Sequence, residues 1–414
     1  MTKKSDAPAI RFKGFSDAWE QRKLEDYLTV SAEKNTGNIY GRSDVLSVSG
    51  DYGIVNQIEF QGRSFAGASV SNYGVVQTGD VVYTKSPLNS NPYGIIKTNK
   101  GKPGIVSTLY AVYHPKENAF SDFIQVYFEQ HARMNNYMHP LVNKGAKNDM
   151  KVSAENALKG PVCFPSRIEQ ESISAFFSVL DNLITLHQRK FEKLTNVKKS
   201  MLEKMFPQNG SSYPEIRFKG FTDPWEQRKL SEMCGTFEYG LNAAAKEFDG
   251  NNKYIRITDI DDASREFLLS DLSSPDICLD GMSKYLLSSG DIVFARTGAS
   301  VGKTYIYREN DGIVYFAGFL IRAKVNQDND AEFVFQSTLS PSYEKYIHIT
   351  SQRSGQPGVN AQEYGEYDLF APSKEEQQRI GHFLRGIDNL ITLHQRELEK
   401  LQNIKKSMLE KMFV

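Results

Sequence analysis

Two long segments of the chain place apolar residues in steps of four and three. The first stripe runs through Ile173, Phe177, Leu180, Ile184, His187, Phe191, Leu194, Val197, Met201 and Met205. The second stripe runs through Ile380, Leu384, Ile387, Ile391, His394, Leu398, Leu401, Ile404, Met408 and Met412. This spacing is typical of a coiled-coil seam, and it predicts two long spacer helices over residues 164–206 and 371–414.

The centre of the predicted seam consists of ten positions. They are Leu180, Ile184, His187, Phe191, Leu194, Ile387, Ile391, His394, Leu398 and Leu401. A stripe this narrow needs a partner helix, and the other copy in the same chain can supply it. Because no Cys, Asp or second His stands at ligand spacing from either histidine, we expect hydrogen-bonded packing there rather than a metal or catalytic role.

Upstream of each long helix, short runs of β-branched and aromatic residues are bounded by Gly or Asp. Examples are "GDVVYTKSP" at Gly79–Pro87 and "GDIVFARTG" at Gly290–Gly298. Two further stretches, Ser121–Met138 and Asp330–Ile347, have helical character. These patterns predict a mixed α/β core upstream of each helix.

The sequence contains an internal repeat. "IRFKGFSDAWEQRKL" at Ile10–Leu24 returns as "IRFKGFTDPWEQRKL" at Ile216–Leu230, and "DNLITLHQR" at Asp181–Arg189 returns at Asp388–Arg396. "KKSMLEKMF" at Lys198–Phe206 also returns at Lys405–Phe413. The two inserts, Leu28–Lys159 and Glu232–Asp368, share little beyond scattered positions such as the Gly-Asp pair at 79–80 and 290–291, called the GD landmark below. One scaffold therefore holds two divergent inserts, which suggests one mechanical task performed with two different recognition surfaces.

These observations give an α+β fold with an internal pseudo-two-fold repeat, in which the two long helices pack antiparallel as a coiled coil. The predicted boundaries are 1–163 for the first domain with its N-terminal box, 164–206 for the first helix, 207–214 for a linker, 215–370 for the second domain and 371–414 for the second helix.

"VFARTGASVGKTYIY" at Val293–Tyr307 resembles a nucleotide-binding loop, since Gly302, Lys303 and Thr304 match its last three positions. The pattern also needs a glycine five residues before Gly302, where this chain has Thr297. The following "TYIY" alternates like a strand, so no helix N-terminus is available for a phosphate. We therefore expect a glycine-rich hairpin loop.

No other catalytic arrangement is found in the sequence. "NPY" at Asn91–Tyr93 has only one of the two prolines of an adenine methyltransferase motif, and no S-adenosylmethionine loop precedes it. Nucleophile-elbow and zinc-hydrolase motifs are also absent from the sequence. We expect a non-catalytic chain with no catalytic residues and no metal site.

Composition adds the cellular setting. Fifty basic and fifty acidic residues cancel, so net charge gives no indication of nucleic acid. Cys163, Cys234 and Cys278 lack disulfide or metal spacing, and the charged start of the chain lacks an apolar signal core. No apolar run reaches the ~20 residues of a membrane span. We expect a cytoplasmic protein.

The repeated WEQRKL boxes, the helix starts "FPSRIEQESI" and "APSKEEQQRI", and the two DNLITLHQR–KKSMLEKMF helices around dissimilar inserts resemble the specificity subunit of type I restriction–modification enzymes. The resemblance spans essentially the whole chain. It implies two target recognition domains, each binding one half of a bipartite, asymmetric double-stranded DNA site. It also implies docking of two modification (methyltransferase) subunits on the helices, with motor–nuclease restriction subunits joining the complex. S-adenosylmethionine, ATP and magnesium would then be used by those partners, and this chain would bind no cofactor.

Polar loop residues are the candidates for DNA contact, since Arg or Lys can pair with guanine edges and Asn or Gln with adenine edges. In the first insert they are Lys85, Ser86, Asn89, Asn91, Lys144, Lys147 and Asn148. In the second insert they are Arg296, Thr297, Ser300, Lys303, Gln352, Arg353, Gln356 and Asn360. The alternative from another class is a coiled-coil interaction scaffold whose two globular modules do not bind DNA.

Overall fold

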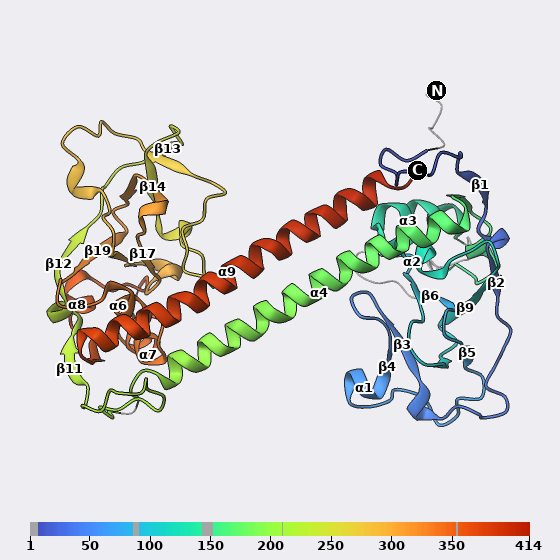
Figure 1. The fold of residues 1–414 in the computed structure, drawn as a ribbon, viewed down its shortest axis with the longest axis horizontal. Coiled ribbons are helices and arrows are strands. Elements are labelled where there is room, and N and C mark those ends of the chain that lie inside the picture. The colour runs from blue at the N-terminus through green and yellow to red at the C-terminus, as the bar shows by residue number, and fades with distance from the viewer. Residues whose placement is uncertain (1–6, 86–90, 143–151, 209, 353–354) are drawn as a thin grey trace. The chain divides into compact units, whose positions relative to one another are not determined.

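The computed structural model describes residues 7–85, 91–142, 152–208, 210–352 and 355–414. The chain forms two compact units: unit 1 contains residues 1–186 and 398–414, and unit 2 contains residues 187–397. Two 38-residue helices, α4 (Arg167–Lys204) and α9 (Lys374–Lys411), each begin in one unit and end in the other (Figure 1). The two long helices predicted from the apolar stripes are therefore present.

Both units contain a four-stranded antiparallel sheet with the same order of strands. In unit 1 the order is β2 (Leu28–Val30), β9 (Tyr110–Pro115), β6 (Val81–Thr84) and β7 (Ile96–Thr98). In unit 2 the order is β12 (Cys234–Tyr239), β19 (Leu320–Val325), β16 (Asp291–Ala295) and β17 (Thr304–Ile306). The two inserts therefore form separate sheets with the same strand order, although they have little sequence in common. We refer to this arrangement as the common sheet.

Two-stranded ladders surround these sheets. In unit 1 they are β1 (Glu20–Lys23) with β10 (Pro161–Phe164), β3 (Leu46–Ser49) with β4 (Gly53–Asn56), and β5 (Gly74–Val76) with β8 (Gly104–Val106). In unit 2 they are β11 (Glu226–Lys229) with β20 (Asp368–Ala371), β13 (Ala245–Glu247) with β15 (Ser273–Pro275), and β14 (Lys253–Ile255) with β18 (Val314–Phe316). The first ladder of each unit pairs the repeated WEQRKL box with the strand that leads into the long helix.

Each of the two stretches with predicted helical character forms two short helices instead of one. The short α-helices of the described residues are α1 (Gln57–Gln61), α2 (Ser121–Glu129), α3 (His131–Met138), α5 (Leu230–Met233), α6 (Ala331–Ser337), α7 (Pro341–Thr350) and α8 (Ala361–Gly365). The backbone of Gln130 is extended and separates α2 from α3. Pro341 opens α7, and the Ser340 side chain caps it by accepting a hydrogen bond from the Tyr343 amide. Proline fits the first turn of a helix but not its interior, which explains the second break.

The GD landmark shared by the inserts is a tight turn before the sheet's third strand. Gly79 and Gly290 have φ of +92° and +82°, a conformation that glycine adopts without steric cost. The next residue holds the turn: Asp80 accepts from the Gln77 amide at 2.7 Å, and Asp291 accepts from the Ser288 amide at 2.9 Å. This Gly-Asp pair therefore forms the turn that positions the strand.

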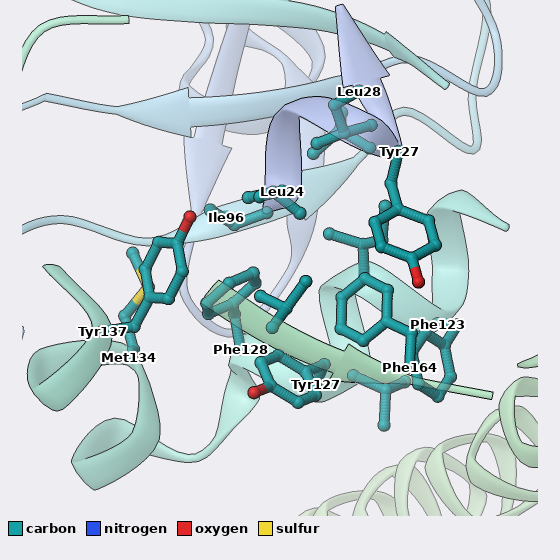
Figure 2. Packing of buried hydrophobic residues seen from close by; sticks show 14 of the residues in the cluster. Leu24, Tyr27, Leu28, Ile96, Phe123, Tyr127, Phe128, Met134, Tyr137 and Phe164 are labelled. Atoms are coloured by element: carbon teal, nitrogen blue, oxygen red, sulfur yellow. The ribbon is translucent and has the colours of Figure 1, made fainter. Parts of the chain in front are cut away.

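The core of unit 1 is aromatic. Phe123 lies against Phe164 with ring centres 4.9 Å apart, and Tyr127 packs at the same distance from Phe164 (Figure 2). Trp19 of the repeated box is buried beside them, with Phe413 from the end of α9 at 6.2 Å. Each buried aromatic ring contributes a large apolar area, so these contacts dominate the packing.

The core of unit 2 repeats this arrangement with the end of the other long helix. Phe206, just after α4, stacks on Phe333 at 5.4 Å and meets Trp225 at 6.2 Å. Residues at and just after the end of α4 thus complete the core of unit 2, as those of α9 complete the core of unit 1. The repeated "KKSMLEKMF" segment therefore has the same packing role in both units.

Buried ion pairs attach each box to its long helix. Arg11 donates two hydrogen bonds to Glu169, both 2.7 Å, and Arg217 donates two to Glu376 at 2.7 and 2.8 Å. Both glutamates lie in the first turn of a long helix and are almost fully buried. A bidentate pair of this kind fixes orientation as well as charge.

The helices pack antiparallel within each unit, as predicted. In unit 1 Asp181 of α4 pairs with Lys405 of α9 at 2.7 Å, and in unit 2 Asp388 of α9 pairs with Lys198 of α4. From Asp181 to Lys198 the residue numbers increase along α4, while the numbers of the contacting residues on α9 decrease from 405 to 388. The two helices therefore run in opposite directions. All ten positions at the centre of the predicted seam are buried or half-buried.

Candidate nucleic-acid interface

In unit 2, two predicted recognition loops come together at the end of β16. The strand pairs antiparallel with β17, so the segment between them is a hairpin loop. The Gly298 amide donates to the Pro357 carbonyl at 3.0 Å, and the Val359 amide donates to the Arg296 carbonyl at 2.9 Å. These bonds tie the segment that begins at Arg296 to the segment 355–360.

The elements that follow the loop differ from those of a nucleotide-binding loop. Gly302 and Lys303 lead directly into the strand β17, which begins at Thr304, where the nucleotide-binding motif has a helix. The Gly302 amide donates to the Tyr364 hydroxyl at 3.1 Å. Lys303 forms an ion pair with Asp262 instead of standing free.

Arg296 has different surroundings from Lys303. Its guanidinium carbon lies 5.2 Å from the Tyr239 ring centre and 5.7 Å from the Phe319 ring centre. Its Nε is buried, and no described residue accepts a hydrogen bond from it. A cation over aromatic faces is attracted by the ring quadrupoles, which holds the side chain in place without neutralising it.

The remaining candidates of unit 2 divide between exposed and packed positions. Thr297 forms a bridge with Gly358, and Ser300 is buried in a short 3-10 turn. Gln356 is exposed, with its amide nitrogen beside Gly298. Asn360 caps α8 by accepting from the Glu363 amide at 2.9 Å. Gln352 is exposed and lies 3.4 Å from His348.

In unit 1 the structure describes two of the seven candidates. Lys85 is half-buried, and burial together with the charge of Lys34 lowers its pKa. Asn91 is only 6% exposed, and its side-chain oxygen lies 2.7 Å from His131 Nδ1, which is a packing arrangement. Five candidates lie outside the described residues, as does one of unit 2; they are Ser86, Asn89, Lys144, Lys147, Asn148 and Arg353.

The seam histidines contact each other. His187 Nδ1 lies 3.1 Å from His394 Nδ1, and burial, followed by the charge of His187, lowers the pKa of His394. Within the described parts of the chain, no group of three His, Cys, Asp or Glu side chains could hold a metal ion. None of the described helices is long and apolar enough to cross a membrane.

Sequence reasoning missed Tyr239 and Phe319. Tyr239 is the last residue of β12, and Phe319 lies in the turn just before β19. Both side chains are exposed, Tyr239 by 47% and Phe319 by 57%. Their position beside Arg296 depends on strand pairing that the sequence does not reveal.

Comparison with known proteins gives consistent matches. Residues 222–403 match the family model for the type I restriction modification DNA specificity domain. The type I restriction enzyme MjaVIII specificity subunit of Methanocaldococcus jannaschii is 25% identical over 321 residues, which cover 75% of this chain and 73% of that protein. The putative MjaX specificity subunit of the same organism is also 25% identical, over 214 residues covering 49% of each chain.

A solved structure shares the fold. The S subunit of a type I restriction–modification system from M. genitalium has a TM-score of 0.64 and 13% identity, with 99% of each chain covered. The repeated boxes, the common sheet and the paired helices define a protein built from two copies of one module. Residues 222–403 thus match the DNA specificity domain of type I restriction–modification systems, and the chain is similar to specificity subunits of these systems in sequence and in fold.

Proposed function

We propose that this chain is the non-catalytic DNA-reading subunit of a type I restriction–modification complex. Each unit contacts one half of a bipartite, asymmetric DNA site. The observation that carries this proposal is the identical strand order of the two sheets beneath different loops. Strand β6 leads into Lys85 and the equivalent strand β16 leads into Arg296, so one scaffold presents two different recognition residues.

The helices offer two equivalent docking surfaces for methyltransferase subunits. In unit 1 the exposed apolar residues Val179, Leu183 and Leu186 follow one another at steps of four and three on α4. In unit 2 the exposed apolar residues of α9 are Phe383, Leu390 and Leu393, at steps of seven and three, and only the two leucines have exposed counterparts in α4. These positions lie on a different face from the seam, because each is one residue away from a seam position.

Repetition of these leucines supports one partner bound twice. Leu183 and Leu186 of the first DNLITLHQR segment correspond to Leu390 and Leu393 of the second, and all four are 38–51% exposed. Exposed apolar residues grouped on one face mark interaction sites. On this proposal S-adenosylmethionine, ATP and magnesium are bound by the partner subunits, and the complex acts in the cytoplasm.

Methylome sequencing tests the function. Cells that express this chain with its methyltransferase partner are expected to gain N6-methyladenine in one motif made of two short sequences separated by a fixed number of unspecified bases. The control is the partner expressed alone. If the chain purifies without a methyltransferase and leaves the methylome unchanged, the DNA-reading proposal is wrong and a protein-binding scaffold takes its place.

A further inference from the structure

The two units place a cation and an exposed apolar residue at the same point of the common sheet. In unit 1 Thr84 pairs with Tyr110, and in unit 2 Ala295 pairs with Leu320. The next residue along the chain is Lys85 or Arg296, and the residue before the partner strand is Leu109 or Phe319. The Lys85 amide donates to the Leu109 carbonyl at 3.1 Å, and the Arg296 amide donates to the Phe319 carbonyl at 3.0 Å.

The exposed residues confirm that these positions are equivalent. Leu109 is 58% exposed and Phe319 is 57% exposed. The units differ in the third member: Tyr239 of β12 corresponds in register to Ala32, because Phe237 faces Ala323 as Val30 faces Tyr113. Unit 2 therefore surrounds its cation with two aromatic rings, whereas unit 1 offers one leucine.

Arg296 lines a cleft and forms no ion pair with any residue that the structure describes. The cleft has a volume of about 570 Å³, and Arg256 and Arg296 are the charged residues that line it. Arg256 is neutralised by a bidentate pair with Asp259 at 2.8 Å. No described carboxylate pairs with Arg296, and its buried Nε has no acceptor among the described residues. The guanidinium therefore keeps hydrogen-bonding capacity that a ligand in the cleft can use.

We propose that Arg296, held by Tyr239 and Phe319, recognises a guanine in the half-site contacted by unit 2. This inference rests on the proposed function. The guanidinium is a planar fork whose donors match O6 and N7 of guanine, whereas phosphate contacts carry no sequence information. Aromatic neighbours and a backbone fixed on both sides reduce the freedom that the side chain loses on binding. Tyr239 is itself positioned, because its hydroxyl accepts from the Ala361 amide at 3.3 Å.

The test compares three variants of the full chain, each expressed with the methyltransferase partner. Methylation is measured on duplexes that carry every base at each position of both half-sites. Arg296→Ala is expected to lower discrimination at one guanine by roughly 5- to 150-fold and leave the other positions and the other half-site unchanged. Arg296→Lys keeps the charge but not the fork, so discrimination at that guanine also falls. Phe319→Leu copies the residue of unit 1 and is expected to lower it less.

Lys284→Ala is the matched control, since Lys284 also lies over a ring, that of Tyr285, at 4.9 Å. It is expected to leave every base preference intact. An equal loss at all sequences in Arg296→Lys, with an unchanged motif, would identify a phosphate or folding role and overturn the inference. If the unmodified chain itself directs no bipartite methylation, the proposed function fails, whatever the variants do.

Discussion

The three cysteines occupy different surroundings, which gives each a different reactivity. Cys234 opens β12 and is completely buried, and burial raises the pKa of its thiol to about 12. Cys278 is exposed and Cys163 is half-buried. The thiolate is the reactive form, so burial suppresses the chemistry of Cys234 both by access and by charge.

Alkylation checks this assignment. With iodoacetamide at pH 8, Cys278 is expected to react in the folded protein while Cys234 stays unmodified, and both should react in urea. Mass spectrometry of the peptides measures each site separately. Equal labelling of Cys234 and Cys278 in the folded protein would contradict the packing of β12.

Residue identities gave the candidates but not their partners. Arg296 and Lys303 looked alike in the sequence as loop cations. The structure pairs Lys303 with Asp262, 41 positions earlier in the chain, and leaves Arg296 over two rings. Asn91 looked like a loop amide and is packed against His131 instead. Such contacts depend on tertiary structure, which local pattern does not encode.

At the scale of elements, each long helix completes a core at its far end. Trp19 and Phe123 surround Phe413, and Trp225 and Phe333 surround Phe206. These pairs occupy equivalent places in the repeat. The end of each helix should therefore stabilise only the unit in which it ends.

Two matched substitutions test this. Phe413→Ala is expected to cost about 3–5 kcal/mol in the free energy of unfolding of unit 1, and Phe206→Ala a similar amount in unit 2, because each leaves a cavity among aromatic rings. Hydrogen–deuterium exchange should show faster exchange in α2 for the first variant and in α6 for the second. Loss of protection in both units from either substitution would argue against separate cores.

Element prediction succeeded where periodicity was long and failed where it was short. Both long helices and the hairpin after β16 follow from apolar spacing. The breaks at Gln130 and Ser340 do not, although Pro341 was a usable signal at the second. The common strand order could not be predicted either, because the two inserts form sheets of the same topology from dissimilar sequences.

At the scale of the whole molecule, the length of the helices matters for the proposed function. Removing Ile184–Lys190 from α4 and Ile391–Glu397 from α9 deletes one heptad from each copy. Seven helical residues span about 10 Å, or roughly 3 bp of duplex, and the seam pattern resumes in register. The unspecified gap in the methylated motif is expected to shorten while both half-sites stay the same. Methylome sequencing that finds an unaltered gap would refute the role of the helices as a spacer.

The duplicated sequence made the architecture of the whole molecule predictable, since repeated boxes around divergent inserts imply two similar modules. It did not reveal that each unit takes helix residues from both halves. That exchange follows from antiparallel packing of two helices longer than either core, and it became visible only with the contacts of Phe206 and Phe413.

One backbone contact occurs twice, once in each unit. The Ile216 amide donates to the Lys204 carbonyl at 2.9 Å, and the Ile10 amide donates to the Lys411 carbonyl at 3.0 Å. Each contact attaches the start of an IRFKGF box to the end of the long helix that completes the same unit. The same backbone bond therefore closes both units, and in unit 1 it joins residues that are 401 positions apart in the chain.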